Sequence, residues 1–294
     1  MRNMLLIANP LAGNMRIRRC LFDLVRLFTA QGDALCVHLT RSPGDGRRVA
    51  RARARDFDLI ICAGGDGTLS ECVGGVLESG AHPTLAYLPL GTTNDLGVSL
   101  GLPRSPLKAA ALALAGTPAP YDVGLLNHRS FAYVAAFGAF TESSYATPQP
   151  IKNTLGRAAY LLYALGSLTE IFPYHMRITG DAGALEGDFL FGAVANALSI
   201  GGMHCFSRDT VRLEDGLLEV LLIRAPVSVF RLQAIVSDLM QQRFDAEEIV
   251  FFQSSFLTVE AEAPVPWTLD GEDGGLVEDA TIHVQKHGVM LVRP

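Results

Sequence analysis

The chain has 294 residues, of which 49% are hydrophobic and 18% are charged, and its formal net charge is −6. This composition excludes a disordered chain, and the length predicts a folded protein of two domains at roughly 100–200 residues each. The negative charge argues against a dedicated nucleic-acid binder, because phosphate contacts need a basic surface. The charge is unevenly distributed, since residues 1–55 contain eleven Arg and only three Asp.

Short apolar runs that are typical of buried strands alternate with helix-like segments in the first third of the chain. Such alternation predicts a parallel, doubly wound α/β sheet. The expected strands cover residues 4–8, 35–39, 58–62 and 84–88, and the expected helices cover about 15–30, 47–55, 69–78 and 107–115.

From about residue 121 the pattern changes to short apolar runs with few helical segments. Residues 121–126 and 130–140, joined by Asn127 and His128, resemble a β-hairpin. The change predicts a β-rich second domain. Further strands are expected at 189–195, 217–223, 249–261, 281–284 and 290–292, and helices at 157–172 and 228–241.

The expected domain division is an α/β domain over residues 1–122 and a β-rich domain over 123–294, whose last strands could pack back on the first domain. Five widely spaced cysteines without a C-x-x-C motif indicate reduced thiols in a cytoplasmic protein. No signal peptide precedes the first strand, and no apolar run reaches the ~18 residues of a membrane-spanning helix. We therefore expect a cytoplasmic protein without a transmembrane segment, for which peripheral contact with a membrane stays open.

Three polar loops that contain glycine end strands of the predicted sheet, at residues 9–14, 64–68 and 89–95. In Gly64-Gly-Asp-Gly-Thr68 the glycines let the backbone approach a bulky anion, and the following helix N-terminus supplies N–H groups and a positive dipole end. Asp66 is unfavourable in a phosphate loop unless it meets a cation, which suggests Mg²⁺ or a role as acceptor for a hydroxyl proton. An ordinary strand-to-helix turn is the alternative.

The carboxyl ends of parallel strands meet at one edge of a sheet, so we expect the three loops together to form a nucleotide-sized site. Asn9, Asn94 and Asp95 belong to the site on this argument, although Asn94 and Asp95 could simply cap the next turn. None of the three lysines follows Gly and precedes Ser or Thr, so the chain lacks a P-loop lysine. Backbone N–H groups and Mg²⁺ would have to neutralise the phosphates instead.

The three loops, in this order and at this spacing, resemble the catalytic domain of the diacylglycerol kinase, sphingosine kinase and bacterial lipid kinase family. The resemblance continues through Asp215-Gly-Leu-Leu-Glu219 and Leu269-Asp-Gly-Glu272, and so spans nearly the whole chain. It implies an α/β domain like those of phosphofructokinase and NAD kinase, then a β-sandwich domain, with ATP in the cleft between them. Gly-Gly-Asp-Gly-Thr alone is less specific, because NAD kinases and phosphofructokinases share it.

The resemblance also implies roles for single residues. Glu272 would be the general base that takes the proton of a lipid hydroxyl. The chemistry of the residues themselves agrees, because Asp66, Asp270 and Glu272 could supply carboxylates for metal and proton as catalytic residues. Asp215 would bind a Mg²⁺ ion distinct from that of ATP, together with the backbone carbonyls of Arg212 and Leu217. Ordinary acidic turns are the alternative for both segments. The nucleotide contacts implied by the motif match are Thr40, Gly64, Gly65, Asp66, Gly67, Thr68, Leu69, Ser70 and Thr92.

The chain departs from the family at two positions, because Ser70 and Gly74 stand where the family usually has Asn. Nucleotide affinity could differ as a result. We expect an ATP- and Mg²⁺-dependent kinase that phosphorylates a lipid such as diacylglycerol, phosphatidylglycerol or a sphingoid base at a membrane surface. The alternatives are a kinase for a soluble substrate such as NAD and a nucleotide-binding protein without catalysis.

Overall fold

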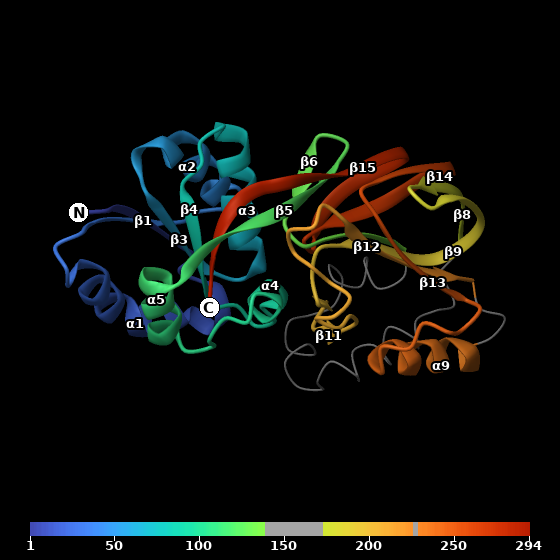
Figure 1. Cartoon of the computed structure of the whole chain (residues 1–294), viewed down its shortest axis with the longest axis horizontal. Helices are drawn as coiled ribbons and strands as arrows, with labels where there is room; N and C mark the ends of the chain where they lie inside the picture. Colours follow the sequence, from blue (N-terminus) through green and yellow to red (C-terminus); the bar gives the residue numbers. More distant parts are fainter. Residues whose placement is uncertain (139–172, 226–228) are drawn as a thin grey trace. The chain divides into compact units, whose positions relative to one another are not determined.

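The computed structural model describes residues 1–138, 173–225 and 229–294 (Figure 1). The helix expected at 157–172 lies outside these residues. The chain forms two compact units, which share the long strands β5 and β15. Unit 1 consists of Met1–Val123, Leu213–Asp215 and Gln285–Pro294, and unit 2 consists of Gly124–Arg212 and Gly216–Val284.

Unit 1 is built on a parallel sheet with the strand order β2-β1-β3-β4-β15. All six residues of Leu59–Gly64 are buried, as in parallel sheets covered on both faces. The end of β15 joins this sheet where Met290 pairs with Thr84 of β4. The strands are β1 (Asn3–Ala8), β2 (Ala34–Leu39), β3 (Leu59–Gly64), β4 (Thr84–Pro89) and the last part of β15 (Glu272–Arg293).

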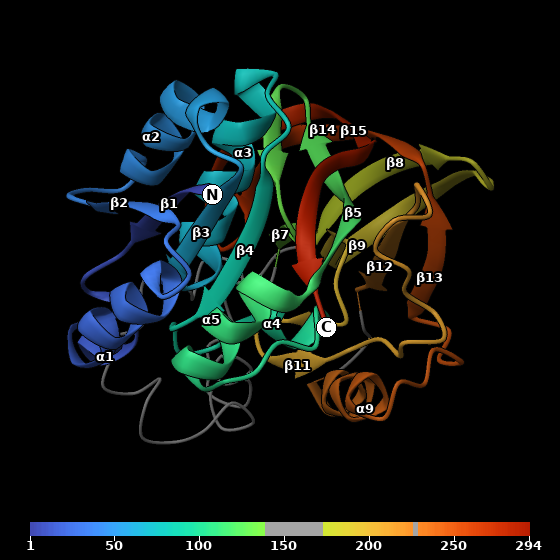
Figure 2. The same ribbon diagram turned by 60° about the vertical axis from the view of Figure 1, so that its left-hand side comes forward.

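Helices cover both faces of this sheet (Figure 2). Leu24 and Phe28 of α1 and Ala110 of α5 share a core with Leu6 and Ile61 of the strands. Helices α2 and α3 lie together on the opposite face. The predicted doubly wound α/β fold is confirmed, and α4 is an addition to it. The helices are α1 (Ala12–Thr29), α2 (Asp45–Arg53), α3 (Asp66–Ser79), α4 (Asp95–Ser99) and α5 (Pro106–Ala115), with a 3-10 turn at Ala54–Asp56.

Unit 2 is the predicted β-rich part, and its paired strands run antiparallel. Its core contains Phe137 and Trp267, whose ring centroids lie 5.0 Å apart, packed with Phe189 and Met176. The elements are β5 (Thr117–Leu126), β6 (Arg129–Phe131), β7 (Val134–Gly138), β8 (Tyr174–Gly180), β9 (Gly183–Ala195), β10 (Ser199–Ile200), β11 (Met203–His204), β12 (Leu218–Arg224), α9 (Val229–Met240), β13 (Ile249–Ser254) and β14 (Phe256–Leu269).

Two predicted strand boundaries in the last third of the chain were wrong. The apolar run 249–261 is divided into β13 and β14, because the chain turns at Ser255, whose N–H donates to the Asp181 carboxylate at 2.6 Å. The runs 281–284 and 290–292 belong to the single strand β15. Among the described residues, no helix is both long enough and apolar enough to cross a membrane.

Candidate functional site

The three glycine-containing loops follow β1, β3 and β4, and they contact one another within unit 1. A side chain at Gly13 would collide with the carbonyl oxygen of Leu90. Leu90 and Gly91 both donate backbone hydrogen bonds to the carbonyl oxygen of Gly64, at 2.7 and 3.1 Å. The loops after β1 and β3 therefore both pack against the start of the loop after β4.

The backbones of the loops after β3 and β4 also approach each other closely at Gly65 and Gly91. A Cβ on Gly91 would lie 2.6 Å from the Cα of Gly65 and 2.8 Å from the amide oxygen of Asn94, so only glycine fits without a backbone shift. Gly65 is also the N-cap of α3, so this close approach lies at the helix end that carries the positive end of the dipole. Bare backbone beside a helix N-terminus is the arrangement that receives phosphate groups in nucleotide sites.

Asp66, the first residue of α3, connects two of these loops. Its carboxylate accepts hydrogen bonds from the backbone N–H groups of Asp95 at 2.9 Å and Leu96 at 3.1 Å, which begin α4. The N-cap of α4 is Asn94, in a left-handed conformation with no capping hydrogen bond of its own, so Asp66 supplies the capping oxygens. The hydroxyl of Tyr87 lies 3.4 Å from the Asp66 carboxylate and 3.2 Å from the Asn94 amide oxygen. Asp66 thereby fixes the loop after β4 relative to the loop after β3.

The sequence contains no clear sign of two features of this region. Tyr87 follows the pattern of an ordinary buried strand residue, and only the position of its neighbours gives its hydroxyl a role. Gly13, Asn14 and Met15 have φ values of 52, 57 and 60°, so a left-handed turn precedes the regular part of α1. Gly13 and Asn14 are residue types that favour such a turn, whereas Met15 gives no sign of it in the sequence.

The other residues predicted to bind the nucleotide surround these loops. The amide oxygen of Asn9 accepts the N–H of Leu11 at 2.9 Å, which shapes the turn after β1. The N–H of Thr40, just after β2, donates to the carbonyl of Ala8 at 2.9 Å, and Thr92 is exposed. All twelve belong to unit 1, namely Asn9, Thr40, Gly64, Gly65, Asp66, Gly67, Thr68, Leu69, Ser70, Thr92, Asn94 and Asp95.

Asp270 lies in unit 2, at a left-handed position (φ 53°) after β14, and is only 6% exposed. Its carboxylate accepts backbone hydrogen bonds from Ala132 at 2.6 Å, Tyr133 at 2.9 Å and Val134 at 3.0 Å. These bonds separate β6 from β7, so the single strand predicted over 130–140 was wrong. The Asp270 carboxylate holds the backbone of its own unit in place.

Glu272 follows this anchored position and is exposed at the start of β15. Arg129 holds the chain on the other side of Glu272, because its guanidinium donates to the carbonyls of Asp273 at 2.7 Å and Gly274 at 2.8 Å. Arg129 was not predicted from the sequence, because it lies more than 140 positions away from its partners. Asp270 and Arg129 together give the Glu272 turn a defined position in unit 2.

The three predicted metal ligands lie on one short segment before β12. Asp215 belongs to unit 1, and its backbone carbonyl accepts a hydrogen bond from the Lys286 ammonium at 3.1 Å. Arg212 and Leu217 belong to unit 2. One carboxylate and two carbonyls are the oxygen donors that Mg²⁺ prefers, so the donor set fits this ion. In the part of the chain that the structure describes, no group of three or more His, Cys, Asp and Glu residues could hold a metal ion.

Comparison with known proteins defines the class. Residues 3–126 match the diacylglycerol kinase catalytic domain, and residues 142–289 match the YegS C-terminal NAD kinase beta sandwich-like domain. A diacylglycerol kinase of Bacillus subtilis is 30% identical over 100% of this chain and 97% of its own length. A YegS-like protein of Chromohalobacter salexigens, described as a lipid kinase, is 33% identical over 82% of this chain and 78% of its own length.

A solved structure of a relative supports the same assignment. A crystal structure from Bacillus anthracis, described as a diacylglycerol kinase, has a TM-score of 0.86 and 27% identity, and covers 100% of this chain and 95% of that chain. The fold and the two matched domains define a lipid kinase, for which ATP is the phosphoryl donor that the family implies. The chain belongs to the diacylglycerol kinase family, together with the YegS-like lipid kinases.

Proposed function

We propose that the protein transfers the γ-phosphoryl group of ATP to the hydroxyl of diacylglycerol or of a closely similar lipid. The observation that carries this proposal is the bridge made by Asp66, which connects the Gly64–Thr68 loop to the N-terminus of α4. The names of the relatives favour diacylglycerol over the other lipids.

Nucleotide binding by unit 1 is supported by its backbone rather than by a lysine. The close packing of Gly91 on Gly65 leaves bare backbone at the N-terminus of α3, which suits a phosphate chain. Bound Mg²⁺ would neutralise phosphate charge during transfer. In this proposal, Asp66 positions the two loops that receive the nucleotide.

Proton removal from the lipid hydroxyl is the role that we propose for Glu272. An exposed carboxylate on a firmly held turn can accept a proton from a substrate that reaches it, and a positioned base typically accelerates a reaction about 10²–10⁴-fold. Asp270 and Arg129 would act as positioning residues, because their hydrogen bonds hold the turn on both sides of Glu272. Asp215, with the carbonyls of Arg212 and Leu217, would hold a structural Mg²⁺ ion.

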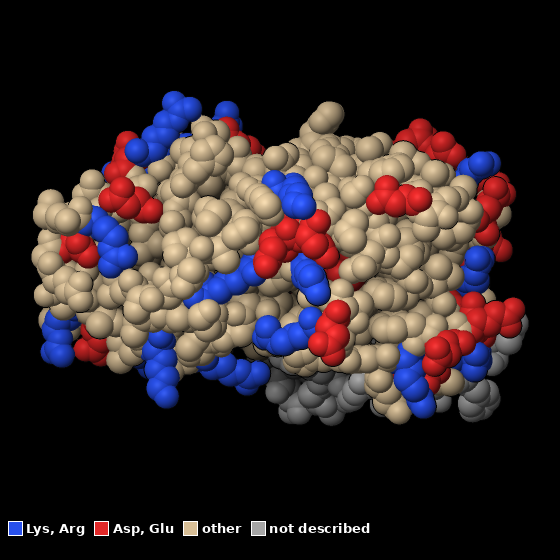
Figure 3. Space-filling view, in the orientation of Figure 1, with Lys and Arg blue, Asp and Glu red and all other residues tan. Residues whose placement is uncertain are grey.

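Peripheral contact with an anionic membrane is the proposed route to the lipid, and α1 supports it. Phe22 of this helix is 79% exposed, and the exposed Arg18 and Arg26 lie one turn before and one turn after it. An exposed aromatic ring flanked by arginines suits the interface of an anionic bilayer. In Figure 3, basic side chains (blue) stand along the lower left edge of the surface, over α1 and α5. We further propose a cytoplasmic location, in keeping with five cysteines that are all free thiols.

The proposal is tested by offering the protein labelled ATP and separate acceptors: diacylglycerol, phosphatidylglycerol, a sphingoid base and NAD. The expected product is phosphorylated diacylglycerol. Phosphorylation of NAD alone would assign the protein to kinases of soluble substrates. ATP binding without transfer to any acceptor would show that it binds nucleotides without catalysis.

A further inference from the structure

We infer that Glu71 is a positioning residue of the nucleotide site, which holds the loop between β2 and α2 against the first turns of α3. This loop carries Thr40, and the inference therefore rests on the proposed binding of ATP by unit 1. Glu71 is not among the residues that the motifs singled out.

The carboxylate of Glu71 binds the start of α2. Its two oxygens accept backbone hydrogen bonds from Gly44 at 2.7 Å and from Gly46 at 2.8 Å. Gly44 is the N-cap of α2 at a φ of 80°, and as a glycine it has no side chain to cap the helix. Glu71 performs this capping from the neighbouring helix, and its charge is favourable at the positive end of the α2 dipole.

The fit between Glu71 and α2 is close. A Cβ on Gly46 would lie 2.7 Å from one carboxylate oxygen of Glu71, so the carboxylate occupies the space that a side chain would need. One turn further along α3, a Cβ on Gly75 would lie 2.9 Å from the Cβ of Ala50 in α2. The two helices therefore touch along the face of α3 that carries Glu71.

The rest of the loop is held as well. Its first residue, Thr40, is bonded through its N–H to the carbonyl of Ala8 at the end of β1. The buried Asp45 accepts the N–H of Arg41 at 3.0 Å and contacts the His38 ring at 2.9 Å. With Glu71 at its far end, the loop is fixed to β1, to β2 and to α3. Thr40 is thus placed relative to the helix whose N-terminus is proposed to receive the phosphates.

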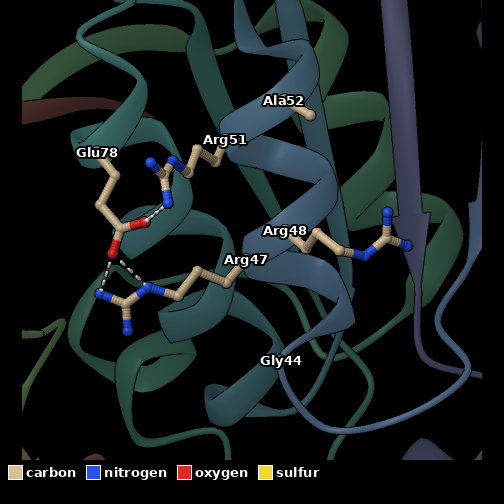
Figure 4. A pocket seen from close by; sticks show the side chains of 6 residues that line it. All are labelled: Gly44, Arg47, Arg48, Arg51, Ala52 and Glu78. Carbon is tan, nitrogen blue, oxygen red and sulfur yellow. Dashed lines mark hydrogen bonds and ion pairs between the residues drawn. The ribbon is translucent and has the colours of Figure 1, made fainter.

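Glu78 gives a matched comparison, because it lies seven residues after Glu71 on the same face of α3. It also bonds to α2, through ion pairs with Arg47 at 2.7 Å and Arg51 at 3.7 Å. Figure 4 shows both guanidinium groups turned toward Glu78 beside an open pocket on α2. These are pairs between partly exposed side chains, and such pairs contribute little to stability. Glu78 therefore connects the same two helices without a bond to the loop backbone.

The direction in which Glu71→Gln changes the affinity for ATP distinguishes a positioning role of Glu71 from a purely electrostatic one. Glu71 is an acid in the second turn of a helix proposed to bind a polyanion, so its charge alone opposes ATP binding. Removal of that charge by Glu71→Gln would tighten ATP binding if electrostatics were its only role. If Glu71 positions the loop, the same substitution weakens ATP binding, because the amide can accept from only one of the two N–H groups.

The experiment compares the wild-type chain with Glu71→Gln, Gly46→Ala and Glu78→Gln. Calorimetry gives the Kd for MgATP, and phosphate transfer to diacylglycerol gives KM for ATP and kcat. For Glu71→Gln we expect Kd and KM to rise about tenfold, the size expected for one lost charge-assisted hydrogen bond, with kcat within about twofold. Gly46→Ala, which displaces the carboxylate without removing it, should change both constants in the same direction, and Glu78→Gln should leave them unchanged.

The inference is overturned, while the proposed function stands, if Glu71→Gln binds MgATP at least as tightly as the wild type, or if Glu78→Gln weakens binding equally. A fall in kcat with unchanged KM would also contradict it. If Glu71→Gln does not fold, Gly46→Ala decides by the same criteria. A wild-type chain that does not bind MgATP would contradict the proposed function, and this inference with it.

Discussion

The three hydrogen bonds to Asp270 predict that Asp270→Asn destabilises unit 2. Asn tolerates the left-handed conformation of this position, so the substitution tests the carboxylate rather than the backbone. One side-chain oxygen becomes an NH₂ group. If the remaining oxygen stays with Tyr133 and Val134, the NH₂ group faces the N–H of Ala132, and two donors then oppose each other in a buried site.

The expected loss is about 3 kcal/mol in the free energy of unfolding. A hydrogen bond to a charged group contributes about 1.5–3 kcal/mol, and the two bonds that remain become weaker because their acceptor is neutral. With a urea dependence of about 2 kcal/mol per molar, the unfolding midpoint should fall by roughly 1.5 M.

The fluorescence of Trp267 allows the unfolding midpoint to be measured with a probe in unit 2. It is the only tryptophan of the chain, is 2% exposed and lies three residues before Asp270. Its fluorescence during urea titration therefore reports the unfolding of the unit that Asp270 stabilises. Asp273→Asn is the matched control, because Asp273 is exposed and its side chain accepts a hydrogen bond from Gly275 only two residues away.

Equal midpoints for Asp270→Asn and Asp273→Asn would refute this reasoning. If Asp270→Asn lowered kcat by orders of magnitude without moving the midpoint, Asp270 would act on the reactants and not through the turn that carries Glu272.

Three further predictions concern unit 1. Gly91→Ala should weaken MgATP binding and lower the melting temperature, because its Cβ would meet the backbone of Gly65. Calorimetry measures the Kd for MgATP and thermal unfolding measures the melting temperature. A variant with the wild-type Kd and melting temperature would contradict the close packing. The hydrogen bond from His38 is the main cause that lowers the pKa of Asp45 from 3.8 to about 2. A lowered pKa of a folded-state carboxyl stabilises the fold above pH 4. As the pH falls from 4 to 2, the free energy of unfolding should therefore decrease by about 2 kcal/mol. Acid unfolding of Asp45→Asn should not show this decrease. Phe22→Ser should weaken sedimentation with anionic vesicles about tenfold, and an unchanged bound fraction would exclude α1 as the contact.

Much of unit 1 could be predicted from sequence, because its elements are specified by local patterns. Continuous apolar runs such as 59–64 form strands wherever a parallel sheet buries both faces. Gly64-Gly-Asp-Gly-Thr68 identified the loop and the start of α3 without any knowledge of the neighbouring chain. Sequence order also placed the loops at one edge, because parallel strands bring their carboxyl ends together.

The contacts between distant segments could not be predicted. Glu71 reads as an ordinary helical residue until α2 lies beside it, and Arg129 has partners more than 140 residues away. The predicted hairpin is confirmed by the antiparallel pairing of β5 and β6, but its second strand ends at Phe131, because the Asp270 carboxylate accepts the N–H groups of Ala132 and Tyr133. Local propensity determines the elements, whereas buried polar groups determine where an element stops.

The central claim is that this chain phosphorylates a lipid hydroxyl with Glu272 as the base. The most direct test measures transfer of labelled phosphate from ATP to diacylglycerol in anionic vesicles, for the wild type and for Glu272→Gln. The account predicts a labelled phospholipid from the wild type, and for Glu272→Gln a kcat lower by about 10²–10⁴ with little change in the Kd for MgATP. It would be contradicted by a wild type that binds MgATP but labels no lipid, or by a Glu272→Gln variant with the wild-type kcat.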